Sequence, residues 1–343
     1  METEQILERL CAVCAPSGFE RPAAQAAKEL LEPLMDEVWT DRLGNLAGVR
    51  RCGKPGAKKL LLDAHLDEVG MVVTGHKDGF LRFSANGVDL RMLPDREVVV
   101  LADPPILGVA ACLPPHVLSA EEREKAPELK DLFIDVGLCQ EEAERRIPVG
   151  TPAVYRAELT RLGERQVCAK ALDDRACFAA LLRAAELLRG RPLDVDLYIL
   201  GSACEEFSGV GAKVGAQALA PDFCVAVDVT HGRTPDSSKD ESFTLGSGPA
   251  VGIGPNCARW MVRRLLDQAA ELNLAVQKEV MEGNSGTNGW PIQVANEGVA
   301  TAVLSIPLKY MHTPVEVAEL SDIEDCARLL AAFAAGLGEE GAQ

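Results

Sequence analysis

The sequence is short of basic residues and lacks any long apolar run. Its 343 residues include 35 Lys and Arg against 52 Asp and Glu, so the formal net charge is -17. This charge would repel nucleic acids and anionic membrane surfaces, and we expect neither as a partner. No apolar run of about 18 residues is present, which argues against a transmembrane helix. The first residues, METEQILERL, are acidic and amphipathic rather than signal-like, so we expect a cytoplasmic location.

Internal repeats and low-complexity segments are also missing. The cysteine count of 11 is odd, and several cysteines lie in apolar runs, for example Cys112 and Cys177. Such residues are typical of buried, reduced thiols. Cys11 and Cys14 form a single CxxC in a stretch with helical spacing. With no second pair nearby, helix packing is favoured over a redox or zinc role.

The two ends of the chain share one pattern and the middle has another. Continuous apolar runs such as KKLLLDAH and DFCVAVDV are typical of strands buried on both faces of a sheet, and amphipathic helical segments alternate with them. Between residues 68 and 161, short β-branched runs are separated by Gly, Pro and Asp. We therefore expect one α/β domain formed by residues 1–67 and 162–343, with a β-rich domain of residues 68–161 inserted into it.

Polar clusters follow four of the apolar runs. The runs end in DAHLDE (63–68), CEE (204–206), VDVTH (227–231) and YMH (310–312), and LDDR (172–175) opens a helix. Ligands bind at the carboxyl edge of open α/β sheets. Each cluster alone has an ordinary explanation as a helix cap or a solvated loop. Five together are harder to explain without cations, because packed carboxylates repel one another.

The clusters contain enough ligands for two divalent ions. The imidazole and carboxylate candidates are His65, Asp173, Glu206, Asp228 and His312. Five ligands suffice for two ions if one carboxylate bridges, and a mixed set of this kind suits zinc, cobalt or manganese better than magnesium. Two such ions activate water and polarise a carbonyl or phosphoryl group.

Neighbouring acids have predicted supporting roles. In an extended chain His65 and Asp67 point the same way, so Asp67 could orient a ligand histidine. Glu205 and Glu206 are expected to point in opposite senses at a strand end. One could then hold a metal ion while the other takes a proton from water.

Seven motifs follow one another in an order that resembles a known enzyme family. They are CAPSGFE, AHLDEVG, KALDDRA, EEFSGVGA, AVDVT, LGSGPAVGIGPN and PLKYMHTPVE. Together they make nearly the whole chain similar to the dinuclear metallo-aminopeptidases of the glutamyl and tetrahedral aminopeptidase family. The resemblance implies a mixed-sheet α/β/α metallopeptidase domain with an inserted, small β-barrel-like dimerisation domain.

The resemblance also implies a role for each site residue. It assigns one ion to His65, Asp173 and Asp228, and the other to Asp173, Glu206 and His312, with Asp173 bridging. It implies two divalent ions per subunit, zinc foremost, with cobalt or manganese as alternatives.

Two supporting residues and one backbone feature follow from the same resemblance. Glu205 would act as general base and Asp67 would orient His65. The Asp173–Asp174 peptide bond would be cis.

The chain departs from the family pattern near the expected substrate pocket. Asn288 stands where relatives have Asp, and Lys309 stands where they usually have Arg. His116 and His231 are further candidates for this pocket. All ligand positions and Glu205 are intact, so we expect the departures to affect substrate preference rather than abolish activity.

The sequence thus predicts a cytoplasmic, metal-dependent aminopeptidase that acts on short peptides. Family members assemble dimers into hollow tetrahedral dodecamers, so the resemblance implies a homo-oligomer, either a dimer or a dodecamer. A related co-catalytic zinc deacetylase or carboxypeptidase is one alternative. A glycosidase using the carboxylate pair Glu205–Glu206 and a non-catalytic metal-binding scaffold are two others.

Overall fold

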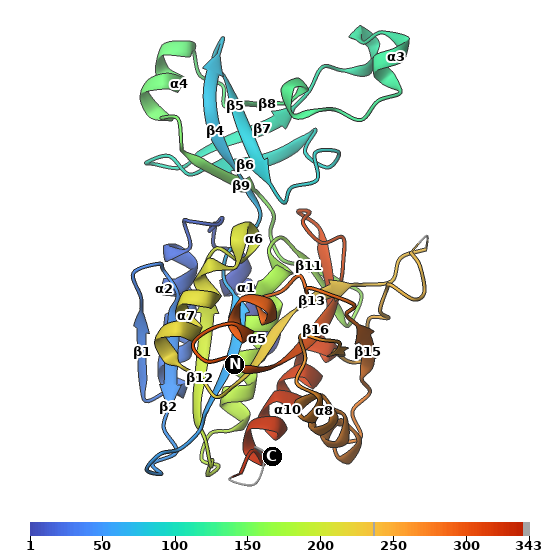
Figure 1. Ribbon diagram of the computed structural model, residues 1–343. Coiled ribbons are helices and arrows are strands. Elements are labelled where there is room, and N and C mark those ends of the chain that lie inside the picture. The colour runs from blue at the N-terminus through green and yellow to red at the C-terminus, as the bar shows by residue number, and fades with distance from the viewer. Residues whose placement is uncertain (236, 339–343) are drawn as a thin grey trace.

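The structure is a computed structural model that describes residues 1–235 and 237–338. Figure 1 shows a larger α/β body and a smaller barrel that stands above it. The chain enters the barrel from the middle of the body and returns to it, so both ends of the sequence build the body. None of the helices in these two ranges is long and apolar enough to cross a bilayer.

A mixed sheet forms the centre of the α/β body. Within the described residues it has 11 strands. In spatial order the main path is β1 (Glu37–Thr40), β2 (Leu46–Arg50), β12 (Asp196–Ser202), β3 (Lys59–His65), β13 (Phe223–His231), β16 (Ala300–Lys309), β17 (Glu316–Glu319), β11 (Gln166–Ala169) and β10 (Thr160–Leu162). β14 (Ala250–Ile253) pairs with β16, and β15 (Gln277–Val280) pairs with β14.

Four neighbouring strands in the middle of this sheet run in the same direction. β3 is parallel to both β12 and β13, and β13 is parallel to β16. The register places Ser202 opposite His65, and Asp228 opposite Ser305. The carboxyl ends of β12, β3, β13 and β16 therefore lie at one edge of the sheet, as the sequence predicted.

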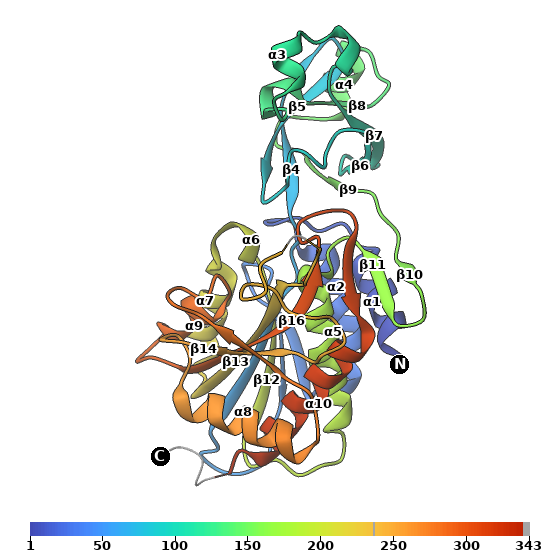
Figure 2. The same ribbon diagram turned by 90° about the vertical axis from the view of Figure 1, so that its right-hand side faces the viewer.

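Helices cover both faces of the sheet. On one side lie α1 (Thr3–Cys11), α2 (Arg21–Leu31), η1 (Glu32–Leu34), α5 (Leu172–Leu187), α8 (Arg259–Glu271) and α10 (Leu320–Gly336). On the other side lie α6 (Glu205–Ser208), α7 (Val210–Leu219) and α9 (Gly289–Gln293) (Figure 2). Leu60 and Leu62 of β3 pack in the first layer and Leu61 in the second. This alternation explains the continuous apolar run, since both faces of the strand are buried.

The inserted segment forms a closed antiparallel barrel of six strands. In order around the barrel they are β4 (Gly70–Lys77), β5 (Phe80–Asn86), β8 (Phe133–Asp135), β7 (Ile106–Ala111), β6 (Arg96–Val100) and β9 (Pro152–Tyr155). All six strands lie within residues 68–161, the segment that the sequence predicts to be β-rich. Short helices lie outside the barrel: η2 (Pro115–Val117), α3 (Ala120–Arg123), η3 (Leu129–Asp131) and α4 (Gln140–Arg146). The structure thus confirms the predicted class, a mixed α/β sheet with a small barrel.

The N-terminal helix is shorter than the sequence pattern suggests. Helical spacing extends to Cys14, but α1 ends at Cys11, which is buried, and Cys14 lies beyond the helix end. The CxxC pair is therefore not contained in one helix. All 11 cysteines lie in the described ranges, and none is disulfide-bonded.

A buried charge cluster lies where the chain leaves the body for the barrel. The Glu68 carboxylate accepts hydrogen bonds from Lys170 Nζ at 2.8 Å, from Arg175 Nη2 at 3.2 Å and from the Ala15 N–H at 2.9 Å. Arg175 is fully buried and also donates to the carbonyl oxygen of Leu10. One acid thus ties the entry strand, the returning chain and helix α5 together.

We expect Glu68→Gln to destabilise the fold strongly. The variant leaves two buried cations without a countercharge, which costs about 3 kcal/mol or more. Chemical denaturation of the purified variants would measure the loss. Glu37→Gln is the matched control, because Glu37 forms an exposed ion pair with Arg51 at 3.0 Å, and such pairs contribute about 1 kcal/mol or less. Equal losses for the two variants would contradict the assigned role of Glu68.

Candidate metal centre

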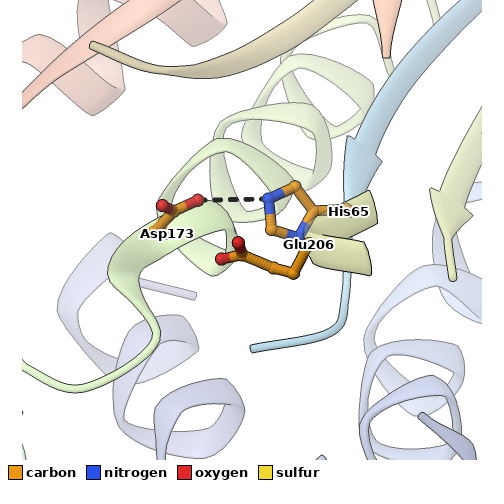
Figure 3. Close-up of side chains that lie close together, drawn as sticks. All are labelled: His65, Asp173 and Glu206. Atoms are coloured by element: carbon orange, nitrogen blue, oxygen red, sulfur yellow. Dashed lines mark hydrogen bonds and ion pairs between the residues drawn. The ribbon is translucent and has the colours of Figure 1, made fainter. Parts of the chain in front are cut away.

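Side chains from five segments converge at the carboxyl edge of the sheet. His65 is the last residue of β3, Asp228 lies near the end of β13, and His312 follows β16. Asp173 comes from the start of α5 and Glu206 from α6, which follows β12. Figure 3 shows His65, Asp173 and Glu206 facing one another. The structure therefore brings together all the residues predicted as metal ligands.

Asp173 lies between the two imidazoles. Its Oδ1 is 3.1 Å from His65 Nε2, and its Oδ2 is 3.2 Å from His312 Nε2. His312 Nε2 is also 3.2 Å from Glu206 Oε2. The two oxygens of one carboxylate thus face two separate groups of donors. The Asp173–Asp174 peptide bond is cis, as the resemblance implied.

Two further acids support the cluster and were not predicted from the sequence. Asp174 Oδ2 accepts the main-chain N–H of His65 at 3.0 Å, and ligand atoms of Asp174, His65 and Asp228 lie within 4.8 Å of one another. Glu316 is buried and accepts the N–H groups of Asp173 at 3.1 Å and His312 at 2.8 Å. The doubled acid of the LDDR motif was the only sequence signal for Asp174, and Glu316 had none beyond its place in PLKYMHTPVE.

Asp67 contacts more groups than the sequence indicated. Its main-chain carbonyl is 3.2 Å from His65 Nδ1, closer than its carboxylate at 3.5 Å. The carboxylate accepts the N–H groups of Glu205 at 3.0 Å and Glu206 at 3.2 Å, and the hydroxyl of Ser17 at 2.6 Å. Asp67 therefore fixes the start of α6 as well as contacting His65.

The expected geometry of the glutamate pair is wrong in one respect. Glu205 and Glu206 begin a short helix rather than ending an extended strand, because Cys204 before them adopts a left-handed conformation with φ 54°. Both side chains still reach the cluster. Glu205 Oε2 lies 3.9 Å from His65 Nε2, while Glu206 faces His312.

Burial and mutual repulsion shift the pKa values of the acids in the cluster. Burial raises the pKa of Glu205 to about 7, and it also raises the pKa of Asp228 and Glu206, with nearby carboxylates adding to the effect. Although burial opposes it, hydrogen bonds with His312 and His65 hold the pKa of Asp173 below its usual range. Hydrogen bonds with Asp173 and Glu206 likewise overcome burial and raise the pKa of His312 to about 11.

The donor set fits divalent cations. Among the described residues, Glu206 Oε1 and Asp174 Oδ1 are buried and have no hydrogen-bond partner. Unpaired buried polar atoms of this kind need an explanation such as a bound ion or water. Imidazole nitrogens and carboxylate oxygens are the donors that zinc, cobalt and manganese accept. A cation would also relieve the repulsion that raises the pKa of the acids.

A pocket of about 280 Å³ opens beside the cluster. It is lined by Asp173, Glu205, Glu206, Asp228, Val229, Thr230, His231, Glu279, Met281, Ser285, Gly286, Thr287, Ser305, Met311 and His312. Of the four residues predicted for a substrate pocket, His231 is among the lining residues. His116 is exposed on η2 of the barrel, and Lys309 ends β16 outside the lining.

Asn288 lies behind the cluster rather than in the pocket. It is buried, and its Nδ2 donates to the Ser202 hydroxyl at 2.8 Å. Asn288 and Ser202 are polar neighbours of Asp63, whose pKa burial raises to about 7. An aspartate at position 288 would add a second carboxylate to this buried space. Asn288 in place of aspartate therefore changes the buried polar contacts next to Asp63 of β3 and not the wall of the pocket.

A barrel inserted into a mixed α/β domain, with imidazoles and carboxylates gathered at the sheet edge, defines a two-domain hydrolase of the metallopeptidase type. The chain belongs to the family described as M42 glutamyl aminopeptidase, whose model matches residues 44–329. It is therefore a peptide hydrolase and an aminopeptidase. Membership of this family also implies the use of divalent metal ions.

Individual relatives match the chain along almost its full length. The lysyl aminopeptidase of Pyrococcus furiosus is 32% identical, over 96% of this chain and 96% of its own. The structure of the aminopeptidase APDkam598 from the archaeon Desulfurococcus kamchatkensis superposes with a TM-score of 0.92, at 36% identity, covering 99% of this chain and 97% of that one. The Pyrococcus horikoshii TET1 peptidase, described as assembling into a tetrahedron or a large octahedral shell, has a TM-score of 0.86 at 28% identity, covering 98% and 100%.

We expect Asp67→Asn to loosen the start of α6. The amide group keeps the size of the side chain but offers one acceptor oxygen in place of two. One of the two N–H groups that donate to Asp67, those of Glu205 and Glu206, therefore loses its acceptor. Amide hydrogen exchange of a peptide covering residues 204–209 should accelerate by about tenfold. Ser17→Ala is the control, since it leaves both acceptors in place. Unchanged exchange in Asp67→Asn would contradict this role.

Proposed function

We propose that the protein removes the N-terminal residue of short peptides using two divalent ions that share Asp173, with Glu205 as general base. The placement of Asp173 carries this proposal, because each of its oxygens faces a different imidazole at 3.1 and 3.2 Å. A carboxylate with both oxygens engaged in this way is suited to bridge two ions.

The family resemblance supplies the ligand sets that we propose. His65, Asp173 and Asp228 would hold one ion, and Asp173, Glu206 and His312 the other. Zinc is the preferred ion for this mixed set, with cobalt or manganese as alternatives. Bound ions of this kind polarise the scissile carbonyl and lower the pKa of water.

Glu205 would move the proton in this mechanism. Its side chain is 16% exposed and lines the pocket, whereas that of Glu206 is only 5% exposed and faces His312. A buried carboxyl with a pKa raised towards neutrality can accept a proton from water and return it to the leaving amine. Asp67 would position Glu205 by accepting its main-chain N–H.

Metal removal and restoration test the proposal. We expect chelator-treated protein to lose turnover of aminoacyl anilides and to regain it with zinc, cobalt or manganese. Turnover of these substrates would argue against a deacetylase or carboxypeptidase, and loss by chelation would exclude a metal-independent glycosidase. If none of the three metals restored turnover, the proposed aminopeptidase mechanism would be refuted.

Glu205→Gln separates catalysis from metal binding in the same experiment. The variant should lower kcat by about a hundredfold or more, while elemental analysis still finds about two ions per subunit. Retained activity would point to a scaffold or to another base. Loss of metal would show that Glu205 is a ligand.

We also propose that the barrel, residues 68–161, is a dimerisation domain of a homo-oligomer, either a dimer or a dodecamer. Strand β7 exposes Leu107 at 50% and Val109 at 42%. The segment after it exposes Leu113 and, at the end of η2, Val117, both at 57%. Such a patch is costly on a surface that stays in water. The TET1 relative supports this proposal by its description as a tetrahedral assembly.

Charge placed on the β7 surface should break the assembly. We expect Leu107→Glu combined with Val109→Glu to reduce the particle mass measured by light scattering. Leu43→Glu, on an exposed loop of the α/β body, is the control and should leave the mass unchanged. An unaltered mass in the double variant would refute the role of this barrel surface.

A further inference from the structure

One carboxylate in the pocket belongs to none of the proposed ligand sets. Glu279 lies on β15 and shares the pocket lining with Asp173 and Glu205. Its Oε1 accepts the hydroxyl of Thr230 at 2.6 Å, and its Oε2 accepts that of Ser305 at 2.7 Å. Both hydroxyl residues are buried, at 5% and 1% exposure, so the carboxylate is held in a fixed position.

The hydroxyl contacts leave the carboxylate able to bind a ligand. A carboxylate offers about four lone-pair sites, and the two hydroxyls occupy two of them. No lysine or arginine lines the pocket in the part of the chain that the structure describes. The charge of Glu279 is therefore not paired with a lysine or arginine of the pocket lining.

The walls of the pocket suit a long, apolar side-chain stem. Val229, Met281 and Met311 line it together with Glu279. Lysine and arginine bury their methylene stems against apolar surface while the charged head reaches a polar group. An acidic N-terminal residue would instead bring a second negative charge towards Glu279.

We propose that Glu279 is a specificity-determining residue that binds the cationic head of an N-terminal lysine or arginine. The proposal rests on the aminopeptidase function proposed above. The preferred substrate class is thus peptides with a basic N-terminal residue. A charge-assisted hydrogen bond in a partly enclosed pocket is strong enough to separate lysine from a neutral side chain of similar shape.

The test compares lysyl, norleucyl and glutamyl anilides with metal-loaded enzyme. Norleucine has a straight apolar chain like that of lysine but no charge, so the ratio of kcat/KM for lysyl over norleucyl substrate isolates the head group. We expect this ratio to exceed one in the unaltered protein and to fall by about tenfold or more in Glu279→Gln. The glutamine side chain of this variant would keep both hydroxyl contacts, because its oxygen accepts one and its NH₂ group can donate to the other.

Controls distinguish this proposal from the function on which it rests. Norleucyl turnover should stay near that of the unaltered protein in Glu279→Gln, which also shows that the variant is folded. Glu282→Gln removes an exposed charge three residues away, outside the pocket lining, and should leave the ratio unchanged. Glu279→Lys should raise turnover of the glutamyl substrate relative to the lysyl one.

The contrary outcomes are equally specific. An unchanged lysyl to norleucyl ratio in Glu279→Gln overturns the proposal while norleucyl turnover leaves the aminopeptidase function intact. A uniform loss across all three substrates also overturns it, since Glu279 would then act on a group that every peptide has, such as the α-amino group. Absence of turnover by the unaltered protein with any substrate and metal would refute the proposed function itself.

Discussion

Buried negative charge at one edge of the sheet is the constraint to which the surrounding structure is fitted. Charged groups taken out of water are costly unless they are paired and hydrogen-bonded. The edge nevertheless holds five acids with little exposure: Asp67, Asp173, Asp174, Asp228 and Glu316. Two imidazoles lie between them, and they are too few to neutralise the cluster. Main-chain N–H groups stabilise part of the remaining charge, and bound cations would neutralise more of it.

The main-chain contribution follows a regular pattern. Three of the five segments that carry a candidate ligand are held by a carboxylate from another segment, which accepts a main-chain N–H group of the ligand residue. Glu316 holds Asp173, Asp174 holds His65, and Asp67 holds Glu206. These contacts orient the ligands and satisfy the acids in the same step. Substitution of one of these acids would therefore displace a ligand residue on another segment, as is common for residues that surround the ligands of a metal site.

The sequence was sufficient to predict those parts of the site whose position depends on a single strand or helix. The strands ending in His65 and Asp228 were predictable because strands buried on both faces form continuous apolar runs, and their parallel arrangement brings their ends together. The start of a helix at Glu205 was not predictable from the sequence, because it depends on the left-handed backbone conformation of Cys204, which tertiary contacts determine. Glu316 escaped notice for the same reason. Its role depends on N–H groups from two distant segments, which no local pattern encodes.

The sheet also separates the proposed catalysis from the proposed selectivity. Every candidate ligand lies on, or next to, the parallel strands or α5. Glu279 instead lies on β15, which pairs with β14 alone in the part of the chain that the structure describes. Thr230 and Ser305, which fix Glu279, come from the same strands as Asp228 and the approach to His312. Their hydroxyl groups are uncharged, so they position Glu279 without changing the net charge of the buried acid cluster. A substitution on β15 can therefore change which side chain is accepted while the buried acids and their supports stay in place.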